Sequence, residues 1–145
     1  MNYVHIVAAL AVLQFLLFGI LVGRARAKHG IKAPATSGNE EFERAFRVQM
    51  NTLEQLVAFL PALLLASAYW SNVIVATIGA VYIAGRFLYR KQYLDNPSSR
   101  TIGFLLTVVP TFTLLAATLV GALLRQAIGR LSCTTPYGDS VLLSP

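Results

Sequence analysis

Four polar residues in the first half of the chain share one face of a predicted helix. Arg44, Arg47, Asn51 and Glu54 are spaced three, four and three residues apart. At about 100° per residue they fall within an arc of roughly 80°. Guanidinium groups bind carboxylates through paired hydrogen bonds, and a glutamate can bind an ammonium group. This face could therefore hold a small zwitterion with more negative than positive groups.

A second polar stripe follows on the next predicted helix. Tyr82, Arg86, Tyr89 and Tyr93 are spaced four, three and four residues apart, an arc of roughly 60° by the same rule. Arginines, one carboxylate, an amide and tyrosine hydroxyls would suit glutathione, which has two carboxylates, one ammonium group and a thiol. The residues alone admit other anionic peptides or lipid headgroups equally well.

Two structural interpretations of these stripes compete with a binding site. Basic and tyrosine side chains can anchor a helix at the membrane edge, and Arg90, Lys91, Lys28 and Lys32 suit that role. Glu54 could also form a purely structural salt bridge with Arg47 or Arg86. Against both, ionisable groups within membrane spans cost about 2.5–3.5 kcal/mol each at the bilayer centre and generally mark a function.

The composition says where these stripes must lie. Of 145 residues, 56% are hydrophobic and only 12% are charged, about half the share of a soluble domain. No Asp, Glu, Lys or Arg occurs in residues 1–23, 55–85 or 101–124, and a spanning helix needs about 20 apolar residues. We predict an all-α integral membrane four-helix bundle. The net charge of +6 fits topology control and anionic lipids rather than nucleic acid.

Turn and capping signals predict the helix boundaries. The predicted helices run from about Tyr3 to Val22, from the capping box Ser37-Gly38-Asn39-Glu40 to Tyr69, from Val73 to Leu94, and from a cap at Asn96 or Ser98 to Arg125. Residues 1–125 thus form the membrane domain, and residues 126–145 are expected to be a disordered tail. Gln14, within the first helix, is expected to donate an interhelical hydrogen bond.

The order of the elements gives an up-down topology. The second and third helices form a hairpin around Ser71-Asn72, so Glu54 and Arg86 both lie roughly 20 Å or more from that turn. Arg26 and Arg100, at the ends of the outer helices, reach the same layer. Because loops 1 and 3 are rich in Arg and Lys, both are predicted to face the cytoplasm. The single Cys133 excludes an intramolecular disulfide, and the separation of His5 and His29 predicts no metal site.

The segment from Glu43 to Glu54 resembles the E-R-x-x-R-x-Q-x-N-x-x-E signature of the MAPEG family, the membrane-associated proteins in eicosanoid and glutathione metabolism. Arg86, Tyr89, Tyr93 and Arg100 have the spacing of the branch that contains cysteinyl-leukotriene synthase and microsomal glutathione transferase type 2. Arg26 is in register upstream. The resemblance covers about residues 1–125.

The resemblance implies a homotrimer of four-helix subunits with glutathione bound between neighbours near the cytoplasmic side. It implies that glutathione is held by Arg26, Arg47, Asn51, Glu54 and Tyr89, with Gln49 from the adjacent chain, Tyr93 lining the site, Arg100 at the sulfur, and Arg44 and Arg86 in support. Two positions depart from the leukotriene synthase pattern: Gln55 replaces an aromatic residue, and Ala27 replaces the arginine with a proton-donor role. The second departure counts against leukotriene synthesis.

Three functions follow as hypotheses. The leading one is a membrane-bound glutathione transferase for lipophilic electrophiles, with glutathione peroxidase activity toward lipid hydroperoxides as an extension. The second is a non-catalytic binding protein of the same fold, which would not need Arg100 at the sulfur. The third is a small drug exporter, which would be expected to carry an acidic residue in its first helix; residues 3–22 contain none.

Overall fold

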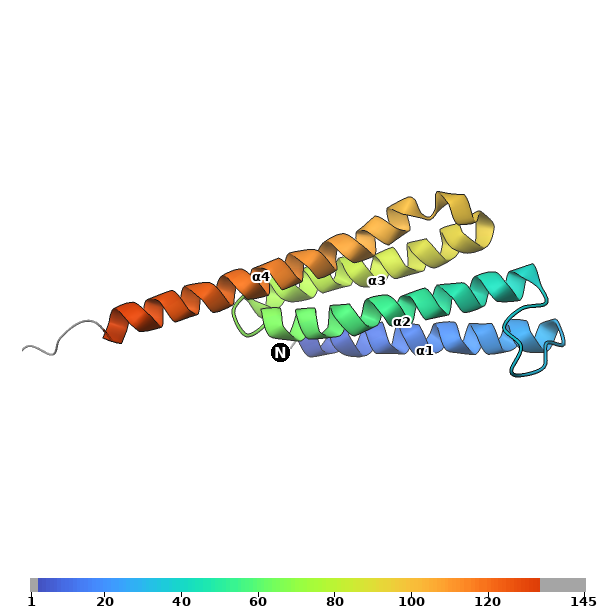
Figure 1. The fold of residues 1–145 in the computed structure, drawn as a ribbon, viewed down its shortest axis with the longest axis horizontal. Coiled ribbons are helices and arrows are strands. Elements are labelled where there is room, and N and C mark those ends of the chain that lie inside the picture. The colour runs from blue at the N-terminus through green and yellow to red at the C-terminus, as the bar shows by residue number, and fades with distance from the viewer. Residues whose placement is uncertain (1–2, 134–145) are drawn as a thin grey trace, which may run out of the picture.

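The computed structural model describes residues 3–133, and these form four long α-helices and one 3-10 turn. The elements are α1 (Tyr3–Lys28), α2 (Glu40–Ala66), α3 (Asn72–Asp95), η1 (Pro97–Ser99) and α4 (Thr101–Cys133). No strand occurs among the described residues. The helices run up and down beside one another (Figure 1), which confirms the predicted all-α four-helix fold.

Each helix is long and apolar enough to cross a membrane, with mean hydropathies of 2.6, 1.3, 1.4 and 2.0 along the chain. Large apolar side chains point outward from the bundle, among them Leu13 at 59% exposure and Val57 and Phe112 at 67%. Such an exterior would be costly in water over so wide an area. It suits the hydrocarbon of a bilayer, so the fold is that of an integral membrane protein.

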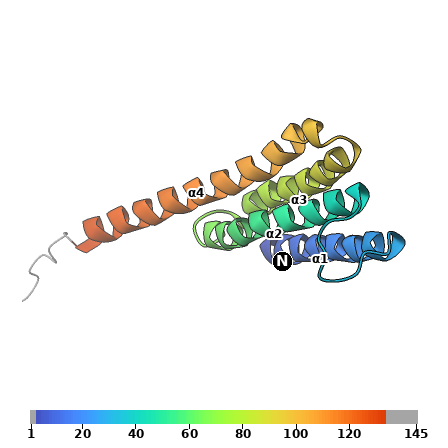
Figure 2. The same cartoon turned by 45° about the vertical axis from the view of Figure 1, so that its right-hand side comes forward.

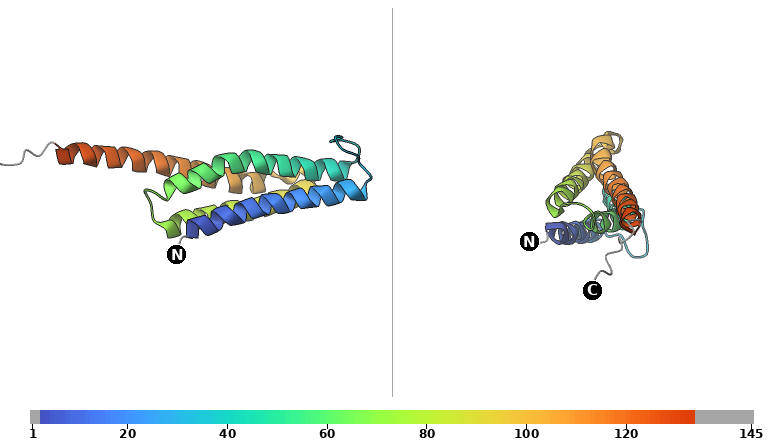
Figure 3. Two further views of the ribbon diagram at one scale, coloured as in Figure 1. Left: turned by 90° about the horizontal axis from the view of Figure 1, so that it is seen from below. Right: turned by 90° about the vertical axis from the view of Figure 1, so that its left-hand side faces the viewer.

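The two connections that carry the basic residues lie at one end of the bundle, opposite the short α2–α3 turn (Figure 1). Seen after a turn of 45°, α4 leaves the bundle and projects well past the α2–α3 turn (Figure 2). The end-on view shows α3 and α4 meeting at their connection and spreading apart toward their other ends, with α1 and α2 lying side by side below them (Figure 3). The polar stripes of α2 and α3 therefore reach the loop end together.

The core lies where α1, α2 and α3 meet and includes the fully buried Leu114 of α4. Phe59 and Tyr82 stack in parallel with ring centroids 3.7 Å apart, and both side chains are buried. Gly79 lets α3 approach closely, since a Cβ there would lie 2.7 Å from Val7 Cγ1. Gln14 Nε2 donates to the carbonyl of Ile83 at 2.9 Å, which confirms the predicted interhelical hydrogen bond.

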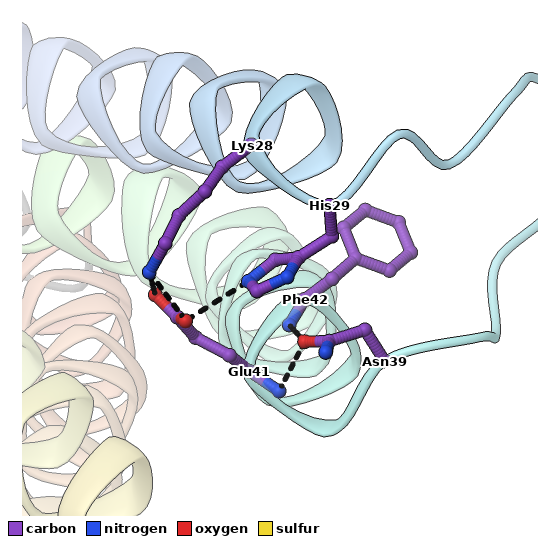
Figure 4. Close-up of polar contacts among 5 residues, drawn as sticks. All are labelled: Lys28, His29, Asn39, Glu41 and Phe42. Carbon is purple, nitrogen blue, oxygen red and sulfur yellow. Dashed lines mark hydrogen bonds and ion pairs between the residues drawn. The ribbon is translucent and has the colours of Figure 1, made fainter.

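The start of α2 differs from the prediction by two residues. Asn39, rather than Ser37, caps the helix: its Oδ1 accepts hydrogen bonds from the backbone N–H groups of Glu41 and Phe42 at 3.0 and 3.3 Å (Figure 4). Glu43 Oε1 reaches back to accept from Gly38 N at 2.8 Å. The start of α2 is therefore capped by the Asn39 side chain, and Glu43 holds Gly38, which has a φ of +131° and precedes the cap.

The other boundaries also shift. The first helix continues past Val22 to Lys28, and its end is tied to α2 because Lys28 Nζ and His29 Nε2 lie 2.7 and 2.9 Å from Glu41 Oε2 (Figure 4). The second helix ends at Ala66 rather than Tyr69. The fourth helix passes the predicted end at Arg125 and continues to Cys133, since no proline interrupts it there. The rest of the predicted tail, residues 134–145, lies outside the described residues.

Candidate functional site

A cleft at the loop end of the bundle gathers most of the predicted site residues. It has a volume of about 360 Å³ and lies between α2, α3 and the start of α4. Its lining consists of Arg47, Asn51, Glu54, Tyr89, Arg100, Thr101 and Phe104. The first five were predicted from their spacing or from the family resemblance. Thus residues more than 50 positions apart in sequence meet in one place.

Arg86 lies behind this cleft and not in it. Its side chain is completely buried, and it donates to Asn51 Oδ1 at 3.1 Å and to Thr52 Oγ1 at 2.6 Å. The guanidinium also lies 4.4 Å from the centroid of the Tyr89 ring. A single buried arginine therefore links α2 to α3 and contacts two residues of the cleft lining, Asn51 and Tyr89.

This arrangement fixes the orientation of the Asn51 amide. Because Oδ1 accepts from Arg86, the NH₂ group points the other way and Nδ2 donates to Glu54 Oε2 at 3.2 Å. Glu54 forms no ion pair among residues 3–133. The structural salt bridge of Glu54 with Arg47 or Arg86 is therefore absent there. The Glu54 side chain is exposed in the isolated chain and available to a ligand.

Arg100 sits at the junction of η1 and α4. Asn96 caps the 3-10 turn, not α4 as predicted: its Oδ1 accepts from Ser98 N at 3.1 Å. The carbonyl of Arg100 accepts the first hydrogen bond of α4, from Phe104 N at 3.0 Å. The guanidinium lies 5.5 Å from the Tyr93 ring centroid. Arg100 thus stands at the positive end of the α4 dipole, where an anion is favoured.

Close packing of α4 on α3 holds Arg100 beside the tyrosines. A Cβ at Gly103 would lie only 2.5 Å from the backbone N and Cα of Tyr89. Gly103 N also donates to Gln92 Oε1 at 3.0 Å, which caps the first turn of α4 with a side chain from α3. Tyr89 and Tyr93 lie with their ring centroids 5.6 Å apart. The positions of Arg100 and Tyr89 are therefore coupled through backbone contact.

Besides the buried Arg86, four predicted residues do not line the cleft of their own chain: Tyr93, which lies beside Tyr89 and Arg100, and Arg26, Arg44 and Gln49. Arg26 donates to the carbonyl of Ala35 at 2.8 Å and lies over the Phe42 ring. Arg44 donates to the carbonyl of Leu94 at 2.9 Å and pairs with Glu40. Gln49 lies against α1, where a Cβ at Gly19 would meet its Nε2 at 2.7 Å. Within one chain, the contacts of Arg26 and Arg44 therefore hold the ends of the helices, and neither side chain lies in the cleft beside Arg47.

Several lining and supporting residues were missed from the sequence. Thr52, Gln92, Thr101, Gly103 and Phe104 carry no charge and have no special spacing. Thr52 follows Asn51 directly in the sequence and lies on the side of α2 that faces α3. This position was the one feature of the sequence that could have indicated its contact with Arg86. Within residues 3–133, no group of three or more His, Cys, Asp or Glu side chains could hold a metal ion.

The chain is thus a small integral membrane protein with a four-helix bundle. A polar cleft at the loop end of this bundle contains two arginines, a glutamate and a tyrosine. Residues 4–120 match the MAPEG family, and the chain belongs to this family.

Relatives agree with this assignment. The chain is 46% identical over 123 residues to the uncharacterized protein sll1147 of Synechocystis sp., an alignment that covers 83% of this chain and 90% of that one. It is 38% identical to human microsomal glutathione S-transferase 2, covering 77% of each chain. It is 33% identical to leukotriene C4 synthase of Cavia porcellus, covering 81% of this chain and 78% of that one.

Proposed function

We propose that this protein is a membrane-bound glutathione transferase that conjugates glutathione with lipophilic electrophiles. The observation that carries the proposal is the convergence of Arg47, Asn51, Glu54, Tyr89 and Arg100 on one cleft. The names of the mammalian relatives, microsomal glutathione S-transferase 2 and leukotriene C4 synthase, support the same chemistry.

The charged residues of the cleft can be matched with one carboxylate, the ammonium group and the thiol of glutathione. Arg47 binds a carboxylate of the peptide through paired hydrogen bonds. Glu54, which forms no ion pair in the described part of the chain, binds the ammonium group. Asn51 stands beside Glu54 and offers its NH₂ group, because Arg86 occupies its oxygen. Tyr89 lines the cleft with Arg47 and Arg100, and the ring of Tyr93 lies beside both Tyr89 and the Arg100 guanidinium.

Arg100 activates the thiol. A free thiol has a pKa near 8.5, so only a few per cent is thiolate at neutral pH. Lowering that pKa by about two units requires roughly 2.7 kcal/mol of preferential stabilisation of the thiolate. A guanidinium about 4 Å away, at an effective dielectric near 20, supplies on the order of 4 kcal/mol. One arginine is therefore sufficient, and the thiol proton passes to water.

The thiolate then attacks an electrophile that arrives from the bilayer. With an aryl chloride, the sulfur electron pair forms the new sulfur–carbon bond and chloride leaves with the electrons of the broken bond. Phe104 lies at the cleft and is 38% exposed, so it offers an apolar edge on the membrane side. We expect the electrophile to be lipophilic, because it reaches the thiolate from the bilayer.

Glutathione peroxidase activity extends the same chemistry. The thiolate attacks a lipid hydroperoxide, the oxygen–oxygen bond breaks, and the alcohol leaves after taking a proton from water. A second glutathione reduces the sulfenic acid to glutathione disulfide and water. Both reactions use the Arg100-stabilised thiolate, and a non-catalytic scaffold would not need Arg100 beside the cleft.

The active form is a homotrimer with its glutathione sites between subunits. The cleft is open on one side, since Arg47, Glu54, Arg100 and Phe104 are exposed in the isolated chain. Arg26 and Gln49, which the resemblance assigns to the site, lie on other faces of the subunit. A neighbouring subunit brings them to the open side. Loops 1 and 3, and hence the sites, face the cytoplasm.

The test is an assay of the purified protein in detergent with glutathione and chlorodinitrobenzene, and separately with cumene hydroperoxide. We expect conjugation well above the uncatalysed rate and at least a tenfold loss in Arg100→Leu. Lys91→Gln, which removes an exposed cation at the same end of the bundle, is the matched control. Glutathione binding with no turnover of either substrate would favour the non-catalytic scaffold and contradict the proposal.

A further inference from the structure

A second cleft lies at the loop end of the bundle, outside the proposed glutathione site. It has a volume of about 600 Å³ and is formed by α1, the start of α2 and the end of α3. Its charged lining is Arg24, Lys28, Glu40, Glu41, Arg44 and Arg90. It shares no lining residue with the cleft that holds Arg100, so the two must be considered separately.

The charges of this second cleft are not balanced. Lys28 pairs with Glu41, and Arg44 pairs with Glu40. Arg24 and Arg90 line the same space but form no ion pair within the described part of the chain. The guanidinium of Arg90 lies 5.6 Å from the Phe18 ring centroid, so it rests on an apolar surface. Two arginines therefore remain to bind an anion.

An apolar furrow lies between α1 and α3, nearer the middle of the bundle than this cleft. It has a volume of about 350 Å³ and is lined by Leu10, Leu13, Gln14, Leu17, Ile83 and Phe87. On α1, residues 10, 14, 17, 21, 24 and 28 follow one stripe, and on α3, residues 83, 87, 90 and 94 follow another. The furrow and the cationic cleft therefore share one seam between α1 and α3, which we call the outer groove.

The dimensions of the outer groove suit a lipid. Leu10 and Arg24 are 14 residues apart, or about 21 Å along the helix, and one leaflet of hydrocarbon is about half of a 30 Å core. Arg24 and Arg90 lie at the loop end, at the level of lipid headgroups. A site for an anion above an apolar furrow matches the two parts of an anionic phospholipid, its phosphate and its acyl chain.

The outer groove also lies away from the proposed subunit contact. Arg24 and Arg26 are about 200° apart around α1, and Gln49 contacts α1 at Gly19, on the Arg26 side. A neighbour that brings Arg26 and Gln49 to a glutathione site leaves the Arg24 face to the membrane. Exposed Leu10, Leu13 and Phe87, at 48%, 59% and 49%, fit that environment.

We propose that the outer groove binds one anionic phospholipid per subunit, with its phosphate between Arg24 and Arg90 and an acyl chain along the furrow. A soluble phosphate offers the same anion without the chain. The lipid is the occupant that uses both halves of the groove. Binding depends on the two arginines and not on the general positive charge of the loops, which distinguishes it from diffuse attraction to an anionic membrane.

Native mass spectrometry of the full chain in detergent tests this directly. Wild type is titrated with phosphatidylglycerol and with phosphatidylcholine of the same acyl chains. We expect at least a tenfold preference for phosphatidylglycerol, one lipid per subunit, and a tenfold or greater loss of that binding in Arg24→Gln/Arg90→Gln. The control Lys32→Gln/Lys91→Gln removes two cations from the same end and should bind within twofold of wild type.

Each remaining outcome has a fixed meaning. Equal lipid binding by wild type and Arg24→Gln/Arg90→Gln, or an equal loss in the lysine control, would overturn the proposal. Displacement of the lipid by millimolar glycerol phosphate would identify a soluble-anion site instead. Arg24→Gln alone guards against misfolding, because Arg24 is exposed and forms no ion pair with any other residue of 3–133. This variant should weaken lipid binding several-fold while conjugation stays at the wild-type rate.

Discussion

Arg86 Nη1 donates a hydrogen bond of 3.1 Å to Asn51 Oδ1, across the contact between α3 and α2. The same guanidinium binds Thr52 and lies against Tyr89. Arg86 is thus a positioning residue: it never reaches the cleft, yet two lining residues depend on it. A lysine at this position has one ammonium group and cannot reproduce the planar arrangement of donors.

We therefore expect Arg86→Lys to weaken glutathione binding by about tenfold, or roughly 1.4 kcal/mol. The turnover number at saturating glutathione should stay near that of wild type, because Arg100 keeps its place. Calorimetry and a separation of KM from kcat measure the two effects. A fall in kcat with unchanged affinity would contradict the positioning role.

Arg47 is exposed at the cleft and is expected to bind a carboxylate of glutathione. Arg47→Ala should raise the dissociation constant by one to two decades, about 1.5–3 kcal/mol for a charge-assisted contact. Lys91→Ala, at the same end of the bundle and outside the cleft, provides the baseline. If calorimetry gives Arg47→Ala the affinity of wild type, Arg47 does not contact the peptide.

Gly103 allows α4 to touch the backbone of α3 at Tyr89. In Gly103→Ala the new methyl group would lie 2.5 Å from Tyr89 Cα, so the helices must separate at a cost of about 1–3 kcal/mol. We expect a lower unfolding temperature and slower conjugation together, because Arg100 moves with α4. Gly129→Ala, in the same helix with nothing within 4 Å, should retain both; equal behaviour of the two variants would refute the close-contact argument.

The open side of the glutathione cleft predicts assembly. Arginines facing lipid are costly, and a closed symmetric ring of subunits covers them. Mass determination in detergent should therefore return three chains per particle. A monomer that still binds glutathione with wild-type affinity would show that the site is complete within one chain.

The sequence predicted the helices and most of the cleft because both depend on periodicity. Arg47, Asn51 and Glu54 recur at helical spacing, and the structure places all three on one cleft wall. The ends of the helices were harder to predict from the sequence. The cap of α2 is Asn39 and not the predicted Ser37, because the position of the cap depends on the turn at Gly38. Periodicity also could not separate Arg86 from Arg47, since which arginine is buried depends on packing between helices.

Contacts made by uncharged residues escaped the sequence for a related reason. Gly103 and Gln92 matter because α3 and α4 approach closely at one point, and that point is fixed by three-dimensional packing. Arg26 shows the opposite case. Its charge and position suggested the cleft, but the fold turns it toward Ala35 and Phe42 on another side of the subunit.

The central claim is that Arg100 stabilises the glutathione thiolate. The most direct measurement is the absorbance of the thiolate at about 240 nm. It is recorded when glutathione is added at neutral pH to wild type and to Arg100→Leu. The account predicts a thiolate signal in wild type, its loss in Arg100→Leu with much of the glutathione affinity retained, and conjugation at least tenfold slower, about 1.4 kcal/mol of barrier. An Arg100→Leu protein with the wild-type thiolate signal and rate would contradict the claim.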